Sequence, residues 1–161
     1  MQNSIQLAER VGAALKSRKL LLSIAESCTG GGVCAAVTDI AGSSEWFDCG
    51  FVTYSNSSKT EILNISASLI AQHGAVSEEI AAAMAEGALA NSEAHIAIST
   101  TGIAGPGGAV PGKPVGTVCF GWVVGGVSHT ERKVFQGDRI AVREQTVNHA
   151  LEKLLRFLDV M

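Results

Sequence analysis

The sequence of 161 residues has few charged and few aromatic side chains. Charged residues make up 17% of the chain and aromatic residues 5%, whereas an ordinary soluble domain is about 25% charged. The net charge is −3 and like charges form no run, so we expect no nucleic-acid partner, because such binders combine a basic patch with stacking aromatics. Hydrophobic residues make up 47%, which excludes disorder. With so few charges to cover the surface, this composition predicts a homo-oligomer.

The chain also has no apolar run near the ~20 residues of a membrane span, so no membrane partner is expected. Its N-terminal residues 1–9 are polar and lack the pattern of a secretory signal, which predicts a cytoplasmic protein. Cys28, Cys34, Cys49 and Cys119 contain no C-x-x-C pair. This spacing indicates neither a zinc site nor a disulfide framework. We therefore expect no metal and no cofactor.

Alternating apolar runs and amphipathic stretches predict a single domain over residues 1–161. Strands are expected near residues 20–25, 46–53 and 95–100, and an antiparallel hairpin over 115–134. Helices are expected near residues 4–18, 33–40, 56–63 and 77–91, from residue 66, and from a capping Asp138 to about Leu158. This order favours a three-layer α/β/α sandwich with a mixed, mostly parallel sheet of about five strands. In such sheets ligands bind beyond the carboxyl ends of the strands, which draws attention to Ser27, Tyr54 and Thr101.

Ser27 is the candidate nucleophile because it follows a buried strand and precedes a glycine-rich turn into a helix. Its hydroxyl could attack a carbonyl carbon while the N–H groups of Thr29, Gly30 and Gly31 hold the oxyanion. Two alternatives remain open. Ser27 or Thr29 could simply cap the helix, and Cys28 is a rival nucleophile, although it has no evident histidine partner.

A serine nucleophile needs a base, and none of the four histidines falls at the three strand ends. Lys59 stands in the first turn of a short helix, where the helix dipole disfavours a positive charge. Partial burial there would lower its pKa and supply a neutral amine. Tyr54 is the only tyrosine and could relay a proton or orient this amine. The alternative is a solvated surface lysine.

Two further segments could bind a ribose or a phosphate. The loop after the third strand includes Thr101, Gly102 and Gly105 but lacks the spacing of a P-loop. Arg139 and Arg143 stand four residues apart at the start of the last helix, and hence on one face, where guanidinium groups suit a phosphate or carboxylate. A flexible surface loop and a pair of ordinary surface arginines are the alternatives.

Several motifs in the same order resemble the C-terminal domain family of CinA. They include AESCTGG at 25–31, GFVTYSN at 50–56, GIAGP at 102–106 and GDR at 137–139, and the match covers nearly the whole chain. The resemblance implies hydrolysis of a small-molecule substrate, nicotinamide mononucleotide, to nicotinic acid mononucleotide and ammonia. It also implies a Ser-Tyr-Lys arrangement, which falls on Ser27, Tyr54 and Lys59. The larger CinA proteins carry a metal-dependent pyrophosphatase domain, for which this chain has no room, so neither that activity nor a metal is expected.

Three functions follow as hypotheses. In the first, Lys59 with Tyr54 activates Ser27 to attack the carboxamide, while Arg139, Arg143 and the loop at 101–106 hold the phosphate and ribose. The second is a non-catalytic nucleotide-binding or protein-interaction module linked to competence or DNA repair. The third is an amidase for another small amide. An inactive module would be expected to lack one of the three catalytic residues, and this chain has all of them.

Overall fold

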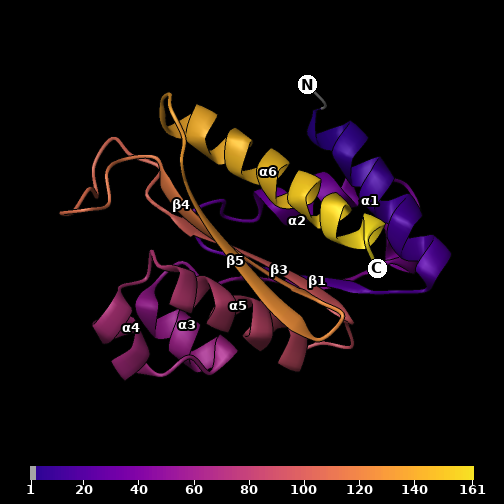
Figure 1. Ribbon diagram of the computed structural model, residues 1–161, viewed down its shortest axis with the longest axis horizontal. Helices are drawn as coiled ribbons and strands as arrows, with labels where there is room; N and C mark the ends of the chain where they lie inside the picture. Colours follow the sequence, from indigo (N-terminus) through magenta and orange to yellow (C-terminus); the bar gives the residue numbers. More distant parts are fainter. Residues whose placement is uncertain (1–2) are drawn as a thin grey trace.

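The computed structural model describes residues 3–161 and consists of a five-stranded sheet between two layers of helices (Figure 1). Met1 and Gln2, which the expected domain over 1–161 includes, lie outside the described residues. The strand order is β2-β1-β3-β4-β5, with bounds β1 (Leu22–Glu26), β2 (Phe47–Val52), β3 (Ile96–Gly102), β4 (Thr117–Val124) and β5 (Val127–Val134). β1 pairs in parallel with β2 and β3, and β4 pairs antiparallel with β3 and β5. Only β4 therefore runs against the common direction, which confirms the expected sandwich with a mixed sheet.

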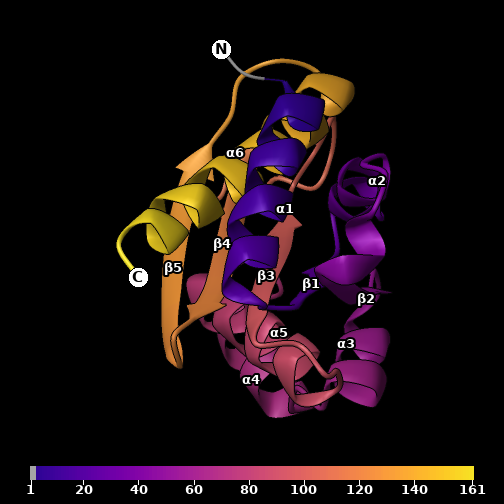
Figure 2. The ribbon, with the colours of Figure 1, turned by 90° about the vertical axis from the view of Figure 1, so that its right-hand side faces the viewer.

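One face of the sheet is covered by α1 (Ser4–Arg18), α2 (Gly32–Thr38) and α6 (Arg139–Asp159) (Figure 2). The β1 side chains of Leu22 and Ile24 pack there against residues such as Val11 and Leu151, all fully buried. Fully burying one such aliphatic side chain contributes roughly 1.5–3 kcal/mol. A short 3-10 helix, η1 (Ser43–Glu45), leads into β2 at the edge of the sheet.

The other face is covered by α3 (Asn56–Leu63), α4 (Ala67–His73) and α5 (Glu78–Ala90). Ala25 of β1 packs on this side together with Ile80 and Met84 of α5. At Gly121 of β4 the helix α5 approaches so closely that an added Cβ would lie 2.4 Å from the carbonyl oxygen of Ala81. None of the helices within residues 3–161 is long and apolar enough to cross a lipid bilayer.

The helix starts follow from local side-chain caps, and the one at Asp138 stands where the sequence predicts it. In five helices the N-cap side chain accepts a hydrogen bond from a backbone N–H, as Ser and Asn or Asp caps do; these caps are Asn3, Ser55, Ser66, Ser77 and Asp138. Helix α2 is the exception, because its N-cap is Gly31, which has no side chain to offer.

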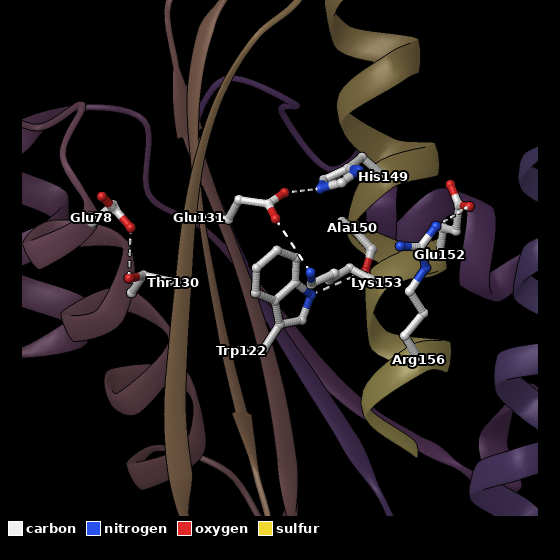
Figure 3. A network of polar contacts seen from close by, with 9 residues as sticks. All are labelled: Glu78, Trp122, Thr130, Glu131, His149, Ala150, Glu152, Lys153 and Arg156. Carbon is white, nitrogen blue, oxygen red and sulfur yellow. Dashed lines mark hydrogen bonds and ion pairs between the residues drawn. The ribbon is translucent and has the colours of Figure 1, made fainter. Parts of the chain in front are cut away.

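Polar contacts of β5 tie the hairpin to both helix layers (Figure 3). Thr130 donates to Glu78 of α5. On the opposite face Glu131 contacts His149 and Lys153 of α6. These contacts dock the middle of α6 onto the sheet. The same helix carries Arg139 and Arg143 in its N-terminal turns.

Candidate active site

The carboxyl ends of β1, β2 and β3 meet at one edge of the sheet, as their parallel pairing requires. A cavity of about 210 Å³ opens there, lined by Ser27, Cys28, Tyr54, Asn56, Lys59, Ala75, Val76, Thr101, Gly102, Ala104 and Arg139. A larger cavity of about 410 Å³ lies between α1, α2 and α6, but it contains none of the candidate catalytic side chains. Sequence reasoning missed Asn56, Ala75 and Val76, since only the folded chain brings the α3 start and the α4–α5 connection to this edge.

Ser27 and Lys59 are in direct contact inside this cavity. The Nζ of Lys59 lies 3.1 Å from the Oγ of Ser27 and also donates to the carbonyl oxygens of Thr53 (2.9 Å) and Tyr54 (3.0 Å). Lys59 is only 1% exposed, and within residues 3–161 it forms no salt bridge. Burial without a counter-ion lowers the pKa of Lys59 below its ordinary value of 10.5. This geometry suits an amine that takes the proton of a serine hydroxyl.

Tyr54 is placed differently from Lys59. Its backbone carbonyl oxygen accepts a hydrogen bond from the Lys59 amine, whereas its phenol oxygen lies 3.4 Å from Nη2 of Arg139. Tyr54 as a whole residue is 62% exposed and lines the cavity on its open side. The structure therefore brings Ser27 and Lys59 together and leaves the phenol outside their hydrogen bonds.

Glu26, which sequence reasoning did not single out, organises the turn after β1. Its carboxylate is fully buried and accepts from the backbone N–H groups of Val33 and Cys34, both at 2.9 Å, and from the hydroxyl of Thr29. Thr29 also shares a hydrogen bond of 2.8 Å with Thr100 of β3. The N-terminus of α2 is thus occupied by a carboxylate of this chain, so the helix start is not open to an anionic ligand.

The loop amides are consequently only partly free to hold an oxyanion. The N–H of Gly30, which we expected among the donors, donates to the carbonyl oxygen of Ser27 at 3.1 Å. The N–H of Gly32 donates to the carbonyl oxygen of Thr29 at 3.0 Å. Within the described residues no backbone acceptor is seen for the N–H groups of Cys28, Thr29 and Gly31. Of the three donors that we expected, Thr29 and Gly31 therefore remain candidates for holding an oxyanion.

Cys28 is poorly suited to be the nucleophile. Burial, together with the nearby charge of Glu26, raises the pKa of its thiol to about 12, so the thiol stays protonated at neutral pH. A protonated thiol is a weak nucleophile. The electrostatics of the cavity therefore favour Ser27 over its neighbour.

The remaining candidate ligand residues lie at different depths. Thr101 and Gly102 line the cavity, but the Thr101 hydroxyl is already bonded to the carbonyl oxygen of Ala75 at 2.8 Å. Arg139 lines the mouth and donates to the carbonyl oxygen of Gly105 at 2.7 Å. Arg143 is not among the lining residues and contacts the back of the Ser27 loop. Within residues 3–161 no group of three or more His, Cys, Asp or Glu side chains is arranged to hold a metal ion.

Comparison with known proteins gives one consistent family. The sequence model of the CinA C-terminal domain matches residues 4–158. The nicotinamide-nucleotide amidohydrolase PncC of Escherichia coli K12 is 51% identical over 151 residues, covering 93% of this chain and 92% of that protein; PncC of Pseudomonas putida is 49% identical over 150 residues, covering 93% and 94%. The crystal structure of competence damage-inducible protein A from Klebsiella pneumoniae matches with a TM-score of 0.95 and 40% identity over 98% of each chain.

Proposed function

The chain belongs to the CinA C-terminal domain family, and from this premise we propose that it hydrolyses the carboxamide of nicotinamide mononucleotide to nicotinic acid mononucleotide and ammonia. The names of relatives near 50% identity support the substrate. The observation that carries the proposal is the buried Lys59 amine at 3.1 Å from the Ser27 hydroxyl. The homo-oligomer and the cytoplasmic location expected from the sequence stay predictions.

In the proposed reaction neutral Lys59 takes the proton of Ser27, and Oγ attacks the carboxamide carbon. The N–H groups of Thr29 and Gly31 hold the developing oxyanion. The tetrahedral intermediate breaks its C–N bond, and Lys59 returns the proton to the leaving nitrogen, so that ammonia departs. Water then attacks the ester on Ser27 and gives its proton to Lys59. Cleavage of the C–Oγ bond, with return of that proton from Lys59 to Oγ, releases the acid and restores both the serine and the neutral amine.

The rest of the cavity is proposed to bind the nucleotide. Arg139, at the mouth beside the Tyr54 phenol, is placed to hold the phosphate. Thr101 and Gly102 line the wall where the ribose would lie. Tyr54 is proposed to act through its carbonyl on the amine and through its phenol on Arg139.

An ammonia-release assay tests this function on nicotinamide mononucleotide, nicotinamide riboside and nicotinamide, with EDTA present. We expect release from the mononucleotide and a loss of roughly 10²–10⁴-fold or more in Ser27→Ala, while Ser128→Ala on the exposed hairpin keeps the activity. Release from nicotinamide alone would discard the nucleotide, and no release from any compound would favour the binding module. Near-normal turnover in Ser27→Ala would show that the serine is not the nucleophile.

A further inference from the structure

Arg143 contacts the backbone of the nucleophile loop and not the cavity. Its Nε donates to the carbonyl oxygen of Cys28 at 3.2 Å and its Nη2 to the carbonyl oxygen of Thr29 at 3.1 Å. Arg139, one helical turn earlier, lines the cavity instead. The two arginines therefore share a helix face but have different surroundings, and a common role in phosphate binding does not follow from their spacing.

The same loop is held from its other side by Glu26. The hydroxyl of Thr29 bonds the Glu26 carboxylate, while the carbonyl of Thr29 accepts from Arg143. A buried anion and a partly buried cation thus hold one residue between them. Among the described residues, Arg143 is the only hydrogen-bond donor to the carbonyl oxygen of Cys28.

This contact determines the direction of an amide. In a trans peptide the C=O and the following N–H point in opposite directions, so a carbonyl of Cys28 held on Arg143 turns the N–H of Thr29 away from α6. That N–H is one of the expected oxyanion donors, and no acceptor for it is seen among the described residues. We propose that Arg143 is a positioning residue that orients the oxyanion donors of the Ser27 loop, and that Arg139 alone holds the phosphate. The inference rests on the proposed amidohydrolase function.

Removal of Arg143 should free the loop, because both residues after Thr29 are glycines. Gly30 and Gly31 have φ values of 59° and 101°, a region that glycine enters and leaves without steric penalty. Without its partner, the Cys28–Thr29 peptide can rotate and carry the Thr29 N–H out of place. A lysine at 143 keeps a positive charge but offers a point charge instead of a fork of N–H groups, so it should not hold both carbonyls.

The test compares Arg143→Gln, Arg143→Lys and Arg139→Gln with Arg156→Gln, which removes an exposed arginine from the far end of the same helix. For each variant we would measure kcat on nicotinamide mononucleotide and the Kd of the product, nicotinic acid mononucleotide. We expect both Arg143 variants to lose about 10- to 100-fold in kcat, since an oxyanion donor is worth about 10²–10³, with the product Kd kept within about twofold. Arg139→Gln should instead weaken product binding at least about tenfold.

A weakened product Kd with unchanged kcat in Arg143→Gln would overturn the proposal and return Arg143 to the phosphate site. Thermal unfolding identifies a variant that fails to fold, in which case Arg143→Lys decides. A second readout, which does not need the natural substrate, is the rate at which an organophosphonate labels Ser27. The phosphoryl oxygen of this reagent needs the same N–H donors as the oxyanion. Slower labelling in Arg143→Gln than in Arg156→Gln supports the positioning role even if the mononucleotide is not hydrolysed, and equal rates, or no labelling of the wild-type serine, contradict it.

Discussion

Lys59 is buried among neutral oxygen atoms, and that surrounding determines its chemistry. Its amine contacts one hydroxyl and two backbone carbonyls, and no carboxylate within residues 3–161 forms a salt bridge with it to stabilise the ammonium form. Removal of water from a charged amine without a counter-ion favours the neutral form. The site thus keeps a base ready at the cost of an unfavourable burial.

Replacement of Lys59 by arginine should remove the base while retaining a cation. A guanidinium does not lose its proton in proteins, so we expect ammonia release to fall about 10²–10⁴-fold. In the wild type, kcat/KM should rise with pH to a plateau whose midpoint lies below 10.5, the ordinary lysine pKa. A profile without this ascending limb would contradict the assignment of Lys59 as the base.

The same pKa shift can be measured as stability, independently of activity. Because burial lowers the pKa of Lys59 in the folded chain, the unfolded chain binds more protons between that lowered pKa and 10.5. The contribution of Lys59 to the free energy of unfolding therefore rises with pH in this window. Urea unfolding should show that the wild type gains relative to Lys59→Met between about pH 7 and about pH 10. An unchanged difference would mean that the pKa is not lowered.

For single residues, the sequence predicted which positions lie at the site better than it predicted where their side chains and backbone groups point. Ser27 and Lys59 could be found because one follows a buried strand and the other stands where a helix dipole disfavours its charge. The direction of the Tyr54 phenol and the carbonyl contacts of Arg143 depend on segments more than 80 residues away, which spacing does not encode. The hydrogen bond of the Gly30 amide to Ser27 likewise could not be predicted, because this i to i−3 turn forms only in the folded loop.

Helix α2 begins without a cap of its own, and a strand residue replaces it. Gly31 offers no side chain, so the N–H groups of Val33 and Cys34 bond the carboxylate of Glu26 at the end of β1. The glycines predicted the helix start correctly, but an N-cap rule looks only at the residue before the helix. A partner five residues further back could not be identified from that rule.

Glu26→Gln tests how much this carboxylate stabilises the fold. The amide oxygen can replace one acceptor, but the amide NH₂ would face donors and leave one of them unsatisfied. We expect the free energy of unfolding to fall by about 1–3 kcal/mol, as measured by urea unfolding followed by circular dichroism. Asp39→Asn, at the exposed C-terminal cap of the same helix, should change it by less than about 0.5 kcal/mol. Equal effects of the two substitutions would show that the Glu26 bonds are not stabilising.

On the scale of the molecule, α6 connects the site to β5, the strand at one edge of the sheet. Its first residue, Arg139, borders the cavity, and His149 in its middle bonds Glu131 of β5 (Figure 3). The layers were predictable because apolar runs, amphipathic stretches and the capping Asp138 are local signals. The strand order was not, because the pairing of β3 with both β1 and β4 joins distant segments.

The docking of α6 should make the whole protein less stable in acid. Burial lowers the pKa of His149 despite the opposing effect of Glu131, so below about pH 6.5 the unfolded chain binds a proton that the folded chain resists. Burial alone would raise the pKa of Glu131, but the contacts of this carboxylate with His149 and Lys153 lower its pKa. The stability that Glu131 contributes is therefore lost only as the pH falls through that lowered pKa. Between about pH 7 and about pH 5 the loss should therefore come mainly from His149. The substitution His149→Gln keeps a side-chain donor for Glu131 but removes the titrating group. The free energy of unfolding of this variant should therefore decline less over this pH interval than that of the wild type. An equally steep decline would show that another group causes the acid sensitivity.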